Sequence, residues 1–76
     1  MAREQVTEIV AEMVANVMKV TVGTGQRVAV GDTLVLLESM KMEIPVLAEH
    51  SGTIAAVKVG TGDVVQEGDV LVAITL

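Results

Sequence analysis

The residue of this chain best placed for chemistry is Lys41, which stands between two methionines in the segment 38–43, Glu-Ser-Met-Lys-Met-Glu. If Met40 and Lys41 are the central residues of a tight hairpin, both need a positive φ, which Asn-Gly or Asp-Gly normally provides. Met-Lys in that position should cost on the order of 1–3 kcal/mol. Glycine is present at the other turns of this chain, so its absence here indicates a functional site. An exposed amine at such a turn is a group that a modifying enzyme can address.

The strand register that follows from this turn is self-consistent. Counting outward, Ser39 faces Met42 and Glu38 faces Glu43. Strand alternation places the next apolar residues on one face, and these are Val35, Leu37, Ile44 and Val46. The two glutamates fall on the other face, where cationic Lys41 would offset their repulsion. We interpret Glu38 and Glu43 either as a solubilising rim or as a collar that the enzyme modifying Lys41 recognises.

An internal repeat supplies the elements that hold this hairpin. When the sequence is shifted by 37 positions, residues 20–39 align with residues 57–76, and ten of the twenty aligned positions are identical. The two copies cover about 8–39 and 45–76, and residues 40–44 lie between them. Such a repeat indicates the architecture before any local propensity is considered.

The repeat and the turns predict an all-β fold. Glycine-containing turns separate short Val-rich runs at regular spacing, which is typical of β-sandwiches and barrels. Each copy should give about four strands, so we predict eight short strands in two four-stranded sheets related by a pseudo-two-fold axis. The Lys41 hairpin would then lie at one end of the domain and both termini at the other.

Residues 6–12 give conflicting signals. Their apolar residues recur at helical spacing, with glutamates gathered on the opposite side. The apolar set is Val6, Ile9, Val10, Met13 and Val14, and the glutamates are Glu4, Glu8 and Glu12. The repeat aligns residues 8–12 with residues 45–49, where Pro45 disfavours a helix. Because both copies should need the same element, we predict a strand over 6–12.

Composition narrows the class of protein. With 76 residues we expect one domain over 1–76, with a core of about 6–76. Ten acidic residues oppose five basic ones, and Phe, Tyr and Trp are absent, which argues against a nucleic-acid partner. No apolar run approaches the roughly 20 residues of a membrane span. We therefore expect no membrane partner, and the absence of cysteine is compatible with a cytoplasmic location.

Catalytic machinery is missing from the sequence. The chain has no cysteine and one histidine, and its hydroxyl residues are scattered in turns, so no nucleophile–base pair is indicated. We interpret His50 as a solvated turn residue, because a lone histidine cannot form a metal site. The two Gly-Thr-Gly elements are turns, since no Gly-Lys-Ser/Thr follows them. We expect neither a catalytic residue nor a metal, and hence a chain that is not itself an enzyme.

The segment around Lys41 resembles the biotin-attachment motif of biotin carboxyl carrier and biotinyl domains, in which Met-Lys-Met is the signature. The downstream spacing is similar to the same family, in the patterns Ala48-x-x-Ser51-Gly52-x-Ile54 and Val59-x-x-Gly62-Asp63-x-Val65-x-x-Gly68-Asp69-x-Leu71. The resemblance covers about residues 8–76. It implies a flattened barrel of two four-stranded antiparallel sheets, with biotin covalently attached to Lys41 on an exposed hairpin and with Met40 and Met42 as part of the recognition motif.

The resemblance also implies a function and partners. A biotin protein ligase would join biotin to Lys41. A biotin carboxylase would then carboxylate the biotin ring, and a carboxyltransferase would move the carboxyl group to an acyl-CoA acceptor. The chain would be the non-catalytic carrier, since the cofactor and the partner enzymes supply the chemistry.

Two other functions remain open on the sequence. A lipoyl domain shares the fold and the lysine hairpin, but typically shows Asp-Lys-Ala, so the methionines favour biotin. A scaffold domain that only makes protein contacts would leave Lys41 unmodified in cells with an active ligase.

Overall fold

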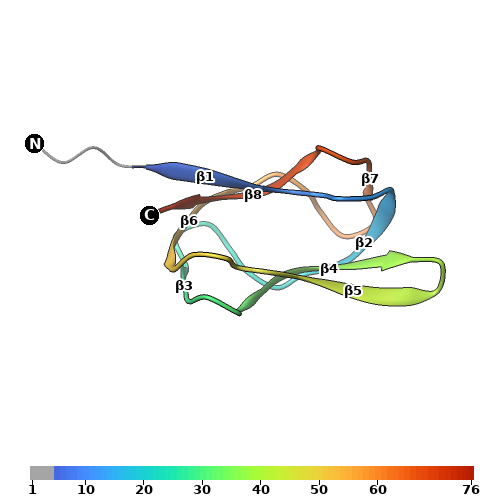
Figure 1. The fold of residues 1–76 in the computed structure, drawn as a ribbon, viewed down its shortest axis with the longest axis horizontal. Coiled ribbons are helices and arrows are strands. Elements are labelled where there is room, and N and C mark those ends of the chain that lie inside the picture. Colours follow the sequence, from blue (N-terminus) through green and yellow to red (C-terminus); the bar gives the residue numbers. More distant parts are fainter. Residues whose placement is uncertain (1–4) are drawn as a thin grey trace, which may run out of the picture.

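The computed structural model describes residues 5–76, and all regular structure in that range is β-strand. The eight strands follow one another along the chain without a helix (Figure 1). Their bounds are β1 (Val6–Val10), β2 (Ala15–Val20), β3 (Arg27–Val28), β4 (Thr33–Ser39), β5 (Met42–Leu47), β6 (Gly52–Val57), β7 (Val64–Val65) and β8 (Val70–Thr75). Within the described range, therefore, no helix is long and apolar enough to cross a membrane.

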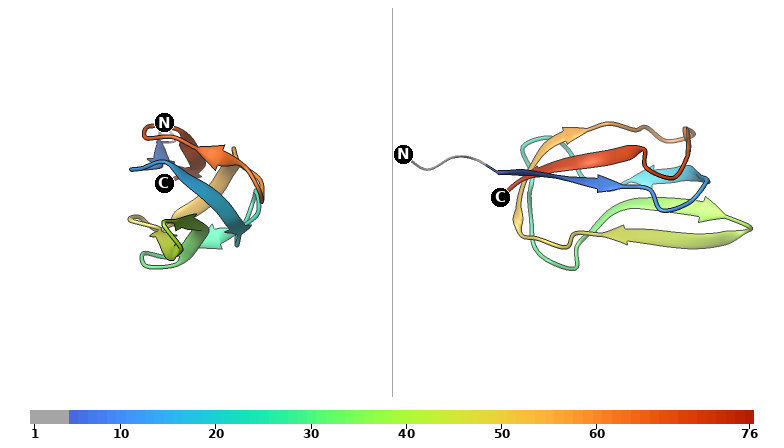
Figure 2. Two further views of the ribbon diagram at one scale, coloured as in Figure 1. Left: turned by 90° about the vertical axis from the view of Figure 1, so that its right-hand side faces the viewer. Right: turned by 45° about the horizontal axis from the view of Figure 1, so that its top comes forward.

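The strands form two four-stranded sheets, in the orders β1-β8-β6-β3 and β5-β4-β2-β7. All strand pairs are antiparallel. The sheets face one another as a flattened barrel, with the β4–β5 hairpin at one end and the C-terminus beside the start of β1 at the other (Figure 2). The predicted all-β fold of two four-stranded antiparallel sheets is confirmed.

The sequence repeat appears in the structure as a pseudo-two-fold symmetry. A shift of 37 positions carries β1, β2, β3 and β4 onto β5, β6, β7 and β8, within one residue at each end. Applied to the strand orders, the same exchange converts one sheet into the other. Loop hydrogen bonds repeat as well, because Ala11 N–H donates to the Asp69 carbonyl at 2.8 Å and Ala48 N–H donates to the Asp32 carbonyl at 2.8 Å.

The predicted strand over 6–12 is confirmed for Val6–Val10, which form β1, whereas Ala11 and Glu12 lie beyond its end and Glu12 is in a bend. This strand pairs with β8, and a bulge between Ile9 and Val10 shifts the register. Ile9 packs against the core, whereas Val6 and Val10 are exposed. Burial alternates from residue to residue along β1, so the helix-like spacing arises because the exposed face of this edge strand also carries apolar residues, Val6 and Val10. Glu4, part of the acidic side of the helical alternative, lies outside the described residues.

The core lies between the sheets and is aliphatic, as the absence of Phe, Tyr and Trp requires. Its fully buried side chains are Leu34, Leu37, Ile54, Leu71, Ile74, Val17, Val35, Val65 and Val72. Most of these are β-branched, and such side chains are stiff and pack well on a pleated surface. No polar side chain of residues 5–76 is buried. The result is a rigid body that supports the Lys41 hairpin.

Two equivalent turns precede β4 and β8. Gly31 has a φ of 93° and Gly68 has a φ of 92°. In each turn the carboxylate of the following aspartate, Asp32 or Asp69, accepts a hydrogen bond of 2.9 Å from the backbone N–H three residues earlier. The two glycines are therefore structural equivalents, in agreement with the 37-residue repeat.

We expect Gly31→Ala and Gly68→Ala each to lower the free energy of unfolding by about 1 kcal/mol or more, because alanine is strained at positive φ. An added Cβ meets no atom within 4 Å at either position, so the cost is purely conformational. Thermal unfolding followed by circular dichroism should show the Tm falling by roughly 4–8 °C per kcal/mol. Gly23→Ala is the matched control, since it adds a Cβ in open space without a positive φ. An unchanged Tm in both variants would contradict the turn geometry.

Candidate functional site

The candidate site is the two-residue turn between β4 and β5, which holds Met40 and Lys41. Across the two strands the pairs are Ser39–Met42, Glu38–Glu43, Leu37–Ile44 and Val35–Val46, as the sequence predicts. The apolar face anchors the hairpin, because Val35 and Leu37 are buried and Ile44 and Val46 pack half-buried against the core.

The turn has the strained conformation that the sequence predicts. Met40 has a φ of 53° and Lys41 has a φ of 64°. Among residues 5–76 they are the only non-glycine residues with a positive φ, and four glycines occupy the other such positions. A side chain held in this region costs on the order of 1–3 kcal/mol. The backbone strain of the described chain is therefore concentrated at the turn that carries the Lys41 amine.

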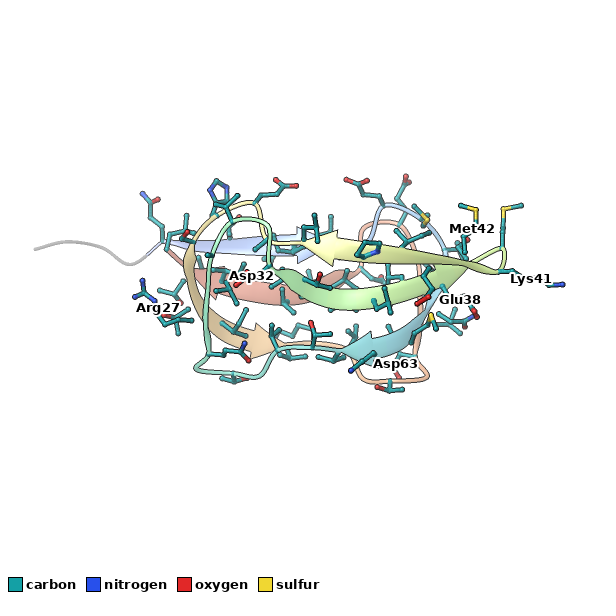
Figure 3. The ribbon with its side chains drawn as sticks, turned by 90° about the horizontal axis from the view of Figure 1, so that it is seen from below. Arg27, Asp32, Glu38, Lys41, Met42 and Asp63 are labelled. Atoms are coloured by element: carbon teal, nitrogen blue, oxygen red, sulfur yellow. The ribbon has the colours of Figure 1, made fainter. Side chains whose placement is uncertain are left out.

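Solvent reaches every side chain at the tip. Met40 is 91% exposed and Met42 is 63% exposed, and Lys41 is exposed as well. Figure 3 shows the Lys41 side chain extending away from the barrel beyond the turn, while Met42 projects to the side of the hairpin. An amine in this position is accessible to a large partner without movement of the sheets, so the site fits a covalently attached group.

Glu38 and Glu43 lie directly opposite one another at the base of the tip. Glu38 is half-buried and Glu43 is exposed, and Figure 3 shows Glu38 lying back along β4 while Lys41 points outward. The predicted facing of the two carboxylates is confirmed. Their role as a recognition collar and the offset of their repulsion by Lys41 stay predictions.

The other candidate residues lie away from the tip. Lys19 is exposed within β2. Lys58 is exposed directly after β6, where its N–H donates to the Leu71 carbonyl at 2.9 Å. His50 is exposed in a bend after β5. In residues 5–76 no three potential metal-ligating side chains come together.

At the opposite end of the barrel, residues 5–76 contain no turn equivalent to the one at Lys41. There Leu76 N–H donates to the Gln5 carbonyl at 2.7 Å, and the repeat aligns these residues with Ser39 and Met42. Strand pairing is therefore alike at both ends, but only the Lys41 end is closed by a turn in the described chain.

One feature near the hairpin was missed by the sequence reasoning. An open, mostly apolar groove of about 600 Å³ runs between β1 and β5, the edge strands of the two sheets. Its lining includes Ile9 from β1 and Ile44 and Val46 from β5. The repeat aligns Ile9 with Val46, so the sequence indicates that these two residues occupy equivalent positions in the two copies. The repeat does not reveal that the two edge strands leave a groove between them.

We expect Lys41→Gly to raise the free energy of unfolding by about 1 kcal/mol, because glycine adopts the positive φ without strain. The variant also removes the amine, so a gain in stability would accompany loss of the functional group. Lys41→Ala is the matched control, since it removes the amine but keeps a Cβ at positive φ. Thermal unfolding should show a higher Tm for Lys41→Gly than for Lys41→Ala, and equal Tm values would contradict a strained turn.

Sequence comparison relates this chain to proteins that carry biotin. The family model Biotin_lipoyl, described as "Biotin-requiring enzyme", matches residues 5–74. A relative in Mycolicibacterium smegmatis, the "Biotinylated protein TB7.3 homolog", is 63% identical over 41 residues. That match covers 54% of this chain and 58% of the relative, so the chain aligns with little more than half of that protein's length.

Structural comparison points to the same fold. A single-chain, multi-domain long-chain acyl-CoA carboxylase matches with a TM-score of 0.87 and 31% identity, over 92% of this chain and 7% of the carboxylase. The lipoyl domain of the 2-oxoglutarate dehydrogenase complex from Azotobacter vinelandii matches with a TM-score of 0.72 and 30% identity, over 83% of this chain and 80% of that domain. The family model covers residues 5–74, and its description names biotin as the required cofactor. The chain therefore belongs to the family of biotin- and lipoyl-attachment domains.

Proposed function

We propose that biotin is attached to Lys41 and that the chain is the biotin carboxyl carrier of a biotin-dependent carboxylase. The observation that carries this proposal is the tip itself, where Lys41 stands exposed at positive φ between two exposed methionines. The family description and the relative named as a biotinylated protein support biotin over a lipoyl group.

Attachment requires one nucleophile and an activated carboxyl group. A biotin protein ligase uses ATP to activate the biotin carboxyl, and the Lys41 Nζ attacks its carbonyl carbon. The Nζ–C amide bond forms, the activating group leaves, and Nζ loses a proton. Met40 and Met42 flank the amine as the recognition motif, and Glu38 with Glu43 marks the base of the tip. The ligase therefore reads a rigid hairpin of fixed shape.

The chain's own residues present the cofactor. When attached, biotin supplies a ring that takes up a carboxyl group at one active site and releases it at another. The buried residues Val35 and Leu37 fix the hairpin to the core, so the origin of the tether is well defined. A tether of this kind raises the local concentration of the carried group to the order of mM at sites within its reach. Catalysis is left to the partner enzymes.

The partners that fit this role are a biotin protein ligase, a biotin carboxylase and a carboxyltransferase. An acyl-CoA is the proposed acceptor, because the carboxylase with the similar fold is a long-chain acyl-CoA carboxylase. This chain corresponds to only 7% of that enzyme, so the catalytic partners are expected in other domains or chains. We propose that the protein works with these partners in the cytoplasm.

Attachment also changes the electrostatics of the tip. Conversion of the Lys41 ammonium to an amide removes one positive charge and moves the formal net charge from −5 to −6. Glu38 and Glu43 then face one another without the nearby cation. Modified and unmodified chains therefore differ in charge at the surface that the partner enzymes meet.

The test is to incubate the purified chain with ATP and either biotin plus biotin protein ligase or lipoate plus lipoate ligase. Intact-mass spectrometry should show the gain of one biotinyl group in the first reaction and no gain in the second. Lipoylation without biotinylation would replace the proposal with the lipoyl alternative, and no gain in either reaction would favour a scaffold domain.

A further inference from the structure

The groove between β1 and β5 has the size and character of a small-molecule site. Its volume of about 600 Å³ lies within the roughly 300–1,000 Å³ of ligand pockets. The lining is mostly aliphatic, and two glutamates at equivalent positions of the repeat, Glu12 and Glu49, supply its charge. Ile9, Ile44 and Val46 are only half-buried there. The groove is therefore an accessible apolar surface built on the rigid body.

An apolar track connects Lys41 to this groove. Alternation along β5 puts Met42, Ile44 and Val46 on the same face of the strand. Ile44 and Val46 line the groove together with Leu37. Met42 continues that face beyond the body of the barrel, where it is 63% exposed. The track thus begins at the residue next to Lys41 and ends in the groove.

The tether is long enough to follow the track. Ile44 is three residues from Lys41, which is about 10 Å along a strand. The lysine side chain and the valeryl chain of biotin contribute ten bonds of about 1.5 Å, and their zigzag spans roughly 12 Å before the ring begins. The ring of biotin therefore reaches Ile44, which is half-buried in the groove, without any change in the hairpin.

We propose that biotin attached to Lys41 folds back along Met42 and rests in the groove beside Leu37 and Ile44. This inference rests on the proposed attachment at Lys41. The apolar valeryl chain and thioether ring match the aliphatic lining, and tethering at an effective concentration on the order of mM favours this occupant over an untethered one. A site with a dissociation constant of about 1 mM would then be about half occupied. The partner enzymes draw the cofactor out of this resting position.

The experiment compares methyl and amide NMR spectra of the unmodified chain and of the chain shown by intact mass to be fully biotinylated. Chemical shifts should change for Ile9, Leu37, Ile44 and Val46 as well as for the tip. Changes confined to residues 39–43 would overturn the proposal. Chemical-shift changes in the groove that grow with protein concentration would show that a second copy of the chain occupies the groove. That result would also overturn the proposal. The two proposals are tested separately. Absence of the biotinyl mass would contradict attachment at Lys41, whereas unchanged groove shifts in a fully biotinylated chain would contradict only the resting position.

A matched pair of variants tests the groove directly. Val10 lines the groove and is 41% exposed, whereas Val64 is 66% exposed and lies outside it. In the biotinylated chain, Val10→Glu should abolish the shifts at Ile44 and Leu37, and Val64→Glu should retain them. Avidin should bind biotin about twofold faster in Val10→Glu than in Val64→Glu, because only the undocked fraction is competent to bind. Equal rates with unchanged groove shifts in the two variants would contradict the resting site.

Discussion

The Lys41→Arg chain is expected to accept no biotin under conditions in which the wild-type chain is fully modified. Arginine keeps the positive charge at the tip, so the electrostatics of the unmodified hairpin are preserved. Its guanidinium stays protonated and does not supply a free amine, so it cannot form the amide bond. Intact-mass spectrometry after incubation with biotin, ATP and ligase should therefore detect only the unmodified mass.

The control for this variant is the double substitution Lys19→Arg and Lys58→Arg. Both lysines are exposed, but neither lies at a turn with positive φ, so their replacement should leave biotinylation complete. Circular dichroism should show equal folding of all the chains. Biotin found on the Lys41→Arg chain, or lost from the double variant, would show that a lysine other than Lys41 is modified.

Moving the lysine by one position should slow biotinylation on the order of 100-fold, because orientation errors of this size are that costly when the reacting atoms are held by an enzyme. The variant is Met40→Lys with Lys41→Met, which conserves composition and net charge. Both residues lie beyond the apolar pairs that anchor the hairpin, so the core is untouched. The amine would leave the turn in another direction, about 3.3 Å from its original position.

Initial rates of biotinylation for the wild-type and swapped chains measure this effect, once circular dichroism has shown equal folding. Both positions have a positive φ, 53° and 64°, so the swap places the same two side chains in the same two strained conformations. A difference in rate therefore reports the position of the amine and not the stability of the turn. Equal rates would mean that the ligase recognises an exposed lysine without reading the hairpin.

The hairpin could be predicted from the sequence because several local rules agree there. Counting from Met40 and Lys41 gives one register that puts Val35 and Val46 on the apolar face and Glu38 opposite Glu43, and the structure has that register. A shift by one residue would have moved the apolar side chains to the solvent face. The positive φ values followed from the short connection alone.

Other features depend on contacts that the sequence does not display. Apolar Val6 and Val10 lie on the exposed face of β1, so the periodicity of residues 6–12 alone favoured a helix, and it is the pairing with β8 that makes this segment a strand. The groove exists because β1 and β5 are the outer strands of separate sheets, and the distance between two unpaired edges has no local sequence signal.

The most direct test of the central claim is to isolate the wild-type chain from cells that contain an active biotin protein ligase and to locate any attached group by tandem mass spectrometry. We expect a single biotinyl group, on the Nζ of Lys41, between Met40 and Met42. A biotinyl group on Lys19 or Lys58, a lipoyl group on Lys41, or an unmodified Lys41 in those cells would contradict the account.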